Sequence, residues 1–211
     1  MRFLAFLFLF TPWLAFAQSD GWVLKNRKDG INVYYKKTAD FHELKLTTSI
    51  QSSLSGIIHL LNDTDRYPNW GYKIMHSHLV KKISDQESIY RSTIDFPWPL
   101  DDRDVVMHSK LTQDEKTKTV YSISEAVPTA YPSQKDLIRI VTSKTRWTLV
   151  PGANGWVYVE YYLYSSPGGS IPDWLVNLAI DVGPRETILR MKNVLQQPAY
   201  KNVKLAYIKE Y

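Results

Sequence analysis

The chain has 211 residues and no cysteine, and 44% of its residues are hydrophobic. Disulfide bonds and a cysteine nucleophile are therefore excluded, and stability has to come from an apolar core. The net charge of +5 arises from 26 Lys and Arg against 21 Asp and Glu. The basic excess is spread along the chain, which is typical of a solvated surface and not of a nucleic-acid site.

Residues 1–17 have the order of a secretory signal peptide. Arg2 precedes an apolar stretch over residues 3–10, and small residues precede a cleavage site before Gln18. The apolar stretch is shorter than the roughly 20 residues that a membrane span needs. We therefore expect a periplasmic or secreted protein in which residues 18–211 form a single domain, and the absence of cysteine favours a bacterial periplasm.

Alternation of apolar and polar residues predicts a chain made mostly of strands. The first two strands, at residues 31–35 and 44–50, are expected to pair in antiparallel fashion. Ser53 then begins a short helix that ends near residues 62–63. Six further strands are predicted, at residues 74–83, 88–94, 103–111, 119–127, 137–149 and 156–164. Together these eight strands form a large antiparallel sheet.

The last major element is predicted to be a long amphipathic helix that begins at Pro172 and ends near Gln197, since proline suits a first helical turn. Trp174 and Leu178 lie on its apolar face, and Gly183-Pro184 is expected to break or kink it. An antiparallel sheet with one early helix and one long final helix belongs to the α+β class. Such a sheet can curl around the final helix and leave an apolar cavity.

The C-terminal residues combine lysines with apolar and aromatic side chains. Lys201, Lys204 and Lys209 alternate with Tyr200, Leu205, Tyr207 and Tyr211. Three interpretations stay open: contact with anionic lipid headgroups, a C-terminal strand, and a flexible end.

No coherent set of catalytic residues is present. Gly168-Gly169-Ser170 lacks the setting of a nucleophilic serine and is typical of a turn. His76 and His78 share a strand face, but a lone histidine pair without acidic companions predicts a polar surface and not a metal site. The acidic residues around Arg103 follow two prolines and are expected to close a turn. We therefore predict a protein that is not an enzyme and has neither a cofactor nor a metal.

Several short motifs, in order along residues 18–211, carry a resemblance to a known family. They are Trp22 with Asp29–Tyr34, Tyr67-Pro68-Asn69-Trp70, Pro97-Trp98-Pro99-Leu100 leading to Arg103-Asp104, and Pro167–Pro172 before Trp174 and Asn177. With them the chain resembles the START family, the steroidogenic acute regulatory-related lipid-transfer domains, in a bacterial exported form. The resemblance implies a helix-grip fold, a curved antiparallel sheet wrapped around a C-terminal helix, with a tunnel for one lipid or sterol.

The resemblance also implies a polar site at one end of the tunnel. In the family the arginine that matches Arg103 often points into the tunnel and meets an acidic residue of a neighbouring strand. Here His76 falls roughly where that acid would lie, so Arg103 pairs either with Asp102 or Asp104 or with a ligand headgroup. Tyr90 is a further neighbour by position.

The predicted ligand-binding set is completed by three residues of the final helix, Trp174, Asn177 and Leu178. The segment from Gly168 to Gly183-Pro184 either moves as a lid or covers the tunnel as a static element.

The expected function is binding, and transfer between membranes, of a lipid or sterol-like ligand by a monomer that touches membranes transiently and binds no nucleic acid. Two alternatives stay open: a cyclase-like enzyme on the same scaffold, and an envelope sensor or interaction module. Several converging acid, histidine and tyrosine side chains in the tunnel would favour the enzyme, whereas apolar walls with one polar anchor favour the carrier.

Overall fold

The computed structural model describes residues 21–38, 42–168, 171, 175 and 182–210. The expected signal peptide, residues 1–17, lies outside these ranges. No helix within them combines the length and apolar character that crossing a membrane requires.

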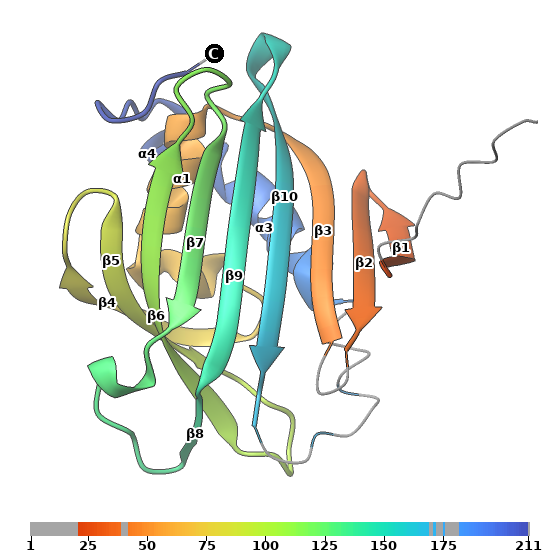
Figure 1. The fold of residues 1–211 in the computed structure, drawn as a ribbon, viewed down its shortest axis with the longest axis vertical. Coiled ribbons are helices and arrows are strands. Elements are labelled where there is room, and N and C mark those ends of the chain that lie inside the picture. Colours follow the sequence, from red (N-terminus) through yellow and green to blue (C-terminus); the bar gives the residue numbers. More distant parts are fainter. Residues whose placement is uncertain (1–20, 39–41, 169–170, 172–174, 176–181, 211) are drawn as a thin grey trace, which may run out of the picture.

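The protein is built on one ten-stranded sheet with helices on one of its sides (Figure 1). The strands are β1 (Val23–Lys28), β2 (Ile31–Lys37), β3 (His42–Gln51), β4 (Ile74–Lys82), β5 (Glu87–Ile94), β6 (Asp102–Gln113), β7 (Val120–Ala126), β8 (Leu137–Ile140), β9 (Thr142–Pro151) and β10 (Trp156–Ser166). The helices are α1 (Leu54–Asn62), α3 (Gly183–Val194) and α4 (Pro198–Lys201), with 3₁₀ turns η1 (Thr64–Asn69), η2 (Pro128–Ala130) and η3 (Ala153–Gly155).

The strand order is β1-β2-β3-β10-β9-β7-β6-β5-β4, and every neighbouring pair in it is antiparallel. The short strand β8 pairs in parallel with Asp102–Val105, the first residues of β6, because β7 pairs only with the later residues of that strand. The sheet is not closed, and it leaves one face toward α1 and α3. This arrangement confirms the predicted α+β class and helix-grip fold.

The sheet has ten strands where the sequence predicted eight. Strand β1 was missed because five of its six residues are exposed, so it has no alternation of buried and exposed positions. The strand predicted at residues 137–149 is two strands, β8 and β9, which meet at the exposed residue Val141. The predicted pairing of the first alternating segments is confirmed, since β2 and β3 are antiparallel neighbours.

Helix α1 begins where the sequence predicts. The Ser53 side chain accepts a hydrogen bond of 3.0 Å from the Gly56 amide, which satisfies one of the free N–H groups of the first turn. Leu54, Ile57 and Ile58 are fully buried, so the apolar face of α1 forms part of the core with the concave side of the sheet.

The C-terminal residues dock on the fold and form no strand over residues 202–210, so the prediction of a C-terminal strand is wrong. The Glu210 carboxylate accepts hydrogen bonds from the amides of Leu54 (2.9 Å) and Ser55 (2.8 Å) at the start of α1. Lys209 exchanges two hydrogen bonds with Gln113 at the end of β6, and Ile208 is buried. The tail therefore joins α1 to the sheet.

Helix α3 packs against β2 and β3 on the concave side. Its buried residues Ile188 and Met191 belong to the core, and Lys192 Nζ donates a hydrogen bond of 3.1 Å to Thr48 Oγ1. Pro184 lies in the first turn of α3, where its missing N–H leaves no bond unmade. Most of the predicted helix before Val182 lies outside the described residues.

Candidate functional site

Successive side chains of β6 point to opposite faces of the sheet. Arg103 pairs with Ile94 and Met107 pairs with Tyr90, so these four side chains share one face. Met107 and Tyr90 are part of the core beneath the helices, which makes this the concave face. The intervening residue Asp104 points to the opposite, convex face, because successive side chains of a strand alternate.

Arg103 is buried on the concave face with only 1% of its surface exposed. Its guanidinium donates hydrogen bonds to backbone carbonyls of Asp101, Pro167 (3.4 Å) and Gly168 (3.4 Å). The group also lies over the Phe96 ring, 4.1 Å from its centre. Burial lowers the pKa of Arg103, and the nearby charge of Asp101 and Asp102 opposes this.

The Arg103 charge has no carboxylate partner among the residues that the structure describes. Asp102 instead accepts a hydrogen bond of 2.9 Å from the Phe96 amide, and Asp104 lies on the other face. Neither of the two acids considered from the sequence therefore pairs with Arg103. Backbone carbonyls neutralise a guanidinium only in part, so the site can still accept an anionic group.

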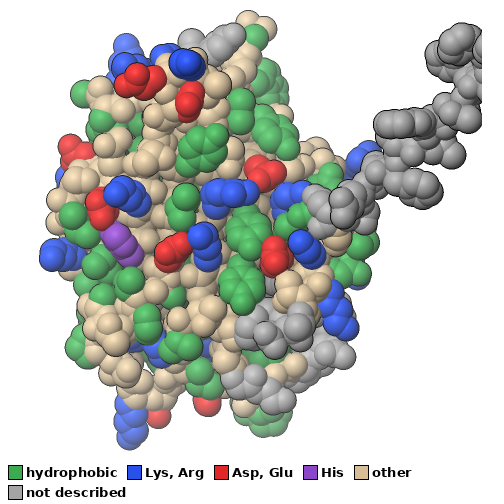
Figure 2. All heavy atoms as spheres, in the orientation of Figure 1, with side chains coloured by type: hydrophobic (Ala, Val, Ile, Leu, Met, Phe, Trp, Pro, Cys, Tyr) green, Lys and Arg blue, Asp and Glu red, His purple; other side chains and the backbone are tan. Residues whose placement is uncertain are grey.

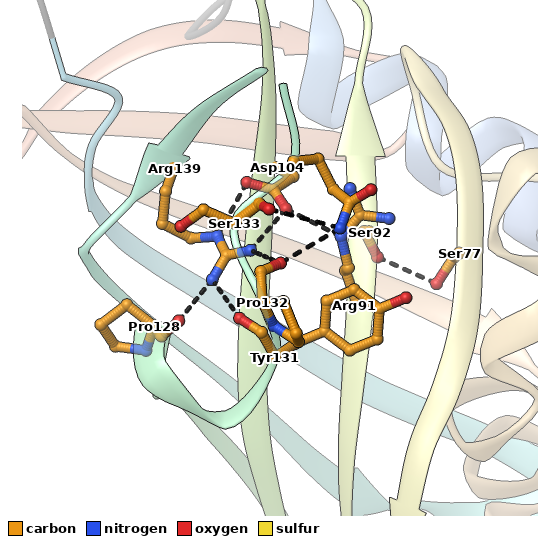
Figure 3. Close-up of polar contacts among 10 residues, drawn as sticks. Ser77, Arg91, Ser92, Asp104, Pro128, Tyr131, Pro132, Ser133 and Arg139 are labelled. Atoms are coloured by element: carbon orange, nitrogen blue, oxygen red, sulfur yellow. Dashed lines mark hydrogen bonds and ion pairs between the residues drawn. The ribbon is translucent and has the colours of Figure 1, made fainter. Parts of the chain in front are cut away.

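Asp104 and two arginines form a buried charged cluster on the convex face (Figure 3). Arg139 binds both carboxylate oxygens at 2.8 Å, and Arg91 Nε donates to Oδ2 at 2.7 Å. Burial alone would raise the pKa of Asp104, but the hydrogen bonds and charge of Arg139 and Arg91 outweigh it and hold the pKa below its usual 3.8.

The same cluster holds the loop between β7 and β8 on the sheet. Arg139 donates to the backbone carbonyls of Pro128, Tyr131 (3.0 Å) and Pro132 (3.1 Å), and Arg91 lies over the Tyr131 ring. Figure 3 shows these carbonyls turned toward the Arg139 guanidinium. Every charge in the cluster has a partner in the chain, so its role is structural.

The interior of the concave side contains a cluster of five aromatic residues, which we call the aromatic cluster. Its members are Tyr67, Trp70, Tyr90, Trp147 and Tyr161, whose ring centres lie 4.4 to 6.5 Å from a neighbour. Burial raises the pKa values of Tyr67, Tyr90 and Tyr161, so these phenols remain neutral. The cluster offers apolar ring surface and a few neutral polar groups.

The structure separates the polar residues that the sequence placed together. Tyr90 and Arg103 share the concave face, but Tyr90 pairs with Met107, four positions along β6 from Arg103. His76 pairs with Thr93, which in turn pairs with Asp104, so His76 belongs to the convex face and is exposed. Its position gives no support to a role beside Arg103.

Trp174, Asn177 and Leu178 lie outside the described residues, as does most of the segment predicted as a lid. Of that segment the structure describes Gly168, Ile171, Leu175 and residues 182–184, and Leu175 is buried.

Sequence reasoning missed the partners of Asp104 and most of the aromatic cluster. Arg91 and Arg139 stand at ordinary polar positions of alternating strands, so nothing distinguishes them from solvated arginines. Trp147 and Tyr161 were assigned to strands without a face. The sequence did carry one signal, since Trp147 and Tyr161 stand equally far from Asn154 in the turn between β9 and β10, and the structure pairs them.

On the convex side, acidic and basic side chains alternate with hydrophobic ones over the strands (Figure 2). Four ion pairs with exposed or half-exposed side chains join charges of opposite sign, at Lys73–Asp95, Lys82–Asp85, Lys144–Glu125 and Arg146–Glu160. This mixture agrees with the solvated surface expected from the sequence.

An open antiparallel sheet whose concave face packs against a C-terminal helix defines the class of helix-grip domains. The START domain model matches residues 14–201 of this chain. The chain belongs to the START domain family.

Individual relatives agree with this assignment. A STAR-related lipid transfer protein fragment from Xanthomonas axonopodis has a crystal structure similar to this one, with 31% identity, a TM-score of 0.77, and coverage of 84% of this chain and 100% of that one. An uncharacterized Pseudomonas aeruginosa protein is 30% identical over 86% of this chain and 90% of its own length. Mouse phosphatidylcholine transfer protein is 23% identical over 77% of this chain and 78% of its own.

Proposed function

We propose that this protein binds one lipid without covalent chemistry on the concave side of its sheet and carries it between membranes. The observation that carries the proposal is Arg103, a buried cation on that side whose hydrogen bonds go to backbone carbonyls. Membership of the START family supports a lipid as the ligand.

The binding energy would come from apolar contact. An acyl chain that leaves water gains about 25 cal/mol for each Å² of apolar surface removed, so an enclosed apolar site can retain it without a reaction. A single charged group then fixes the orientation of the lipid. Arg103 would take this role by binding an anionic headgroup oxygen, for which guanidinium is well suited.

A phospholipid is the first ligand to test, because a relative is named for phosphatidylcholine transfer. Tunnel binding, transfer and the monomeric state belong to this proposal, as does export to the periplasm after removal of residues 1–17.

The direct experiment is native mass spectrometry of the protein purified from cells, followed by solvent extraction and identification of the released lipid. We expect a bound mass of lipid size. Fluorescent phosphatidylcholine in donor vesicles should then move to acceptor vesicles faster when the protein is added.

The role of Arg103 is tested by Arg103→Leu, with Arg27→Leu as the matched control because Arg27 is exposed on β1. We expect Arg103→Leu to retain a different set of headgroups and the control to retain the wild-type set. If both variants hold the same lipids as the wild type, Arg103 is not part of the site. A wild type that holds no lipid under any condition would refute the function itself.

A further inference from the structure

The indole N–H of Trp70 is a buried hydrogen-bond donor without an acceptor. Trp70 is 4% exposed, and within the described part of the chain its Nε1 is the only buried side-chain nitrogen or oxygen that lacks a hydrogen-bond partner. Leaving such a donor unpaired costs its full desolvation, so native structures nearly always supply an acceptor.

The surrounding backbone holds Trp70 in place. The Trp70 and Gly71 amides donate hydrogen bonds of 3.1 and 2.7 Å to the Tyr67 carbonyl at the end of η1. A Cβ at position 71 would lie 2.5 Å from Ile74 Cδ1 and 3.0 Å from the Tyr67 carbonyl oxygen, so a larger residue there would require the Ile74 side chain to move. The indole itself is buried against the rings of Tyr67 and Trp147, so it cannot turn to another partner without displacing them.

The ring of Trp70 faces the aromatic cluster. Its centre lies 5.0 Å from that of Tyr67 and 6.5 Å from that of Trp147, both in edge-to-face geometry. The hydroxyl of Tyr67 donates to the Leu61 carbonyl at 2.6 Å, so it serves the fold and not Trp70. A guest on the concave side would therefore meet the indole donor among aromatic rings.

The chemistry of the surroundings selects the kind of acceptor. Within the described residues no lysine or arginine lies over any ring of the aromatic cluster, while such contacts do occur at other rings. A charged acceptor would be left without a countercharge in this apolar setting, which is unfavourable. A neutral oxygen needs only the single N–H.

We propose that Trp70 Nε1 binds a neutral oxygen of the lipid, an ester carbonyl or a sterol hydroxyl. This inference rests on the proposed function and adds a second polar contact to it, distinct from Arg103. Arg103 would recognise a charged headgroup, and Trp70 would recognise the uncharged part of the guest that follows it into the aromatic cluster.

The test compares lipids that differ only in the acceptor. Dioleoyl phosphatidylcholine is compared with its diether analogue, which lacks both carbonyls, and 5α-cholestan-3β-ol with 5α-cholestane, which lacks the hydroxyl. Binding is measured by competition in native mass spectrometry. We expect wild type to prefer the oxygen-bearing member of one pair by about 3- to 10-fold, as one net hydrogen bond provides.

The variant Trp70→Phe keeps an aromatic ring and removes the donor, and it should reduce this preference to near unity. Trp147→Phe is the matched control, because it removes an indole from the same cluster and should keep the preference. In wild-type protein labelled with ¹⁵N, one indole N–H signal should move downfield with the preferred lipid and not with its analogue, a readout that needs no variant.

The outcomes separate this inference from the proposed function. In one outcome, wild type and Trp70→Phe show the same preference for the oxygen-bearing lipid over its analogue, with no indole signal moved. This result would overturn the role of Trp70 and leave lipid binding intact. That result would point to a trapped water as the acceptor. If none of the four lipids binds, the proposed function fails and this inference fails with it.

Discussion

Arg103 and Asp104 are neighbours in β6, both are 1% exposed, and yet their surroundings differ completely. Asp104, on the convex face, is bound by two arginines through three short hydrogen bonds. Arg103, on the concave face, donates hydrogen bonds only to backbone carbonyls in the described structure. A buried charge that the chain neutralises itself serves stability, whereas one that it leaves partly neutralised is suited to bind a ligand.

The largest loss of stability is expected from Asp104→Asn. The substitution leaves two buried guanidinium groups without their countercharge and should lower the free energy of unfolding by about 3–5 kcal/mol. Chemical denaturation monitored by tryptophan fluorescence measures it. The matched control is Asp85→Asn, which removes the exposed Lys82–Asp85 ion pair and should cost less than about 1 kcal/mol. Equal losses for the two variants would contradict a structural role for Asp104.

The contribution of Asp104 should disappear in acid. Its pKa is lower in the folded state than its usual 3.8, so its charge stabilises the fold above that value and loses this effect as the pH falls through the folded pKa. The difference in unfolding free energy between wild type and Asp104→Asn should be constant above about pH 5 and shrink below about pH 4. A difference that stays unchanged down to pH 3 would mean that another group carries the effect.

A smaller loss of stability is expected from Glu210→Gln. The neutral amide keeps one oxygen for the amides of Leu54 and Ser55 but loses the charge that favours a helix N-terminus. We expect a loss of about 1 kcal/mol or less in the free energy of unfolding. Glu115→Gln, in the exposed turn after β6, serves as the control and should leave stability unchanged.

The smallest change in stability is expected from Arg103→Leu, although the two residues of the comparison are adjacent. Arg103 has no carboxylate hydrogen-bonded to it in the described structure, so Arg103→Leu leaves no buried opposite charge uncompensated, and the free energy of unfolding should change by no more than about 1 kcal/mol. The same denaturation experiment measures it. A loss as large as that of Asp104→Asn would show that Arg103 also serves the fold.

Much of the fold follows from local pattern. Ser53 marks the start of α1 because its side chain caps the helix, and the alternation in β2, β3, β5 and β7 identifies them as strands. The elements that the local sequence pattern does not predict depend on contacts between residues far apart in the chain. Strand β1 is exposed, and the tail is ordered by Gln113 and Glu210 contacts that no local signal announces.

The site shows the same division. Arg103 and Tyr90 could be placed in strands from the sequence, but their faces could not, because these follow from the register in which Tyr90 pairs with Met107. The face of His76 depends on how β4 pairs with β5, and that register shifts between Ile74 and His76. The Trp70 donor is evident only when every neighbouring acceptor is known.

The hydrogen bond from Leu54 to Glu210 spans 156 positions of the chain. Contacts of such long separation form late, because the entropy of closing the intervening loop must be overcome first. We therefore expect the contact of Glu210 with the start of α1 to form last during folding. The C-terminal tail should also be the first part of the structure to open. Hydrogen exchange at the Leu54 and Ser55 amides would report this opening ahead of the central strands.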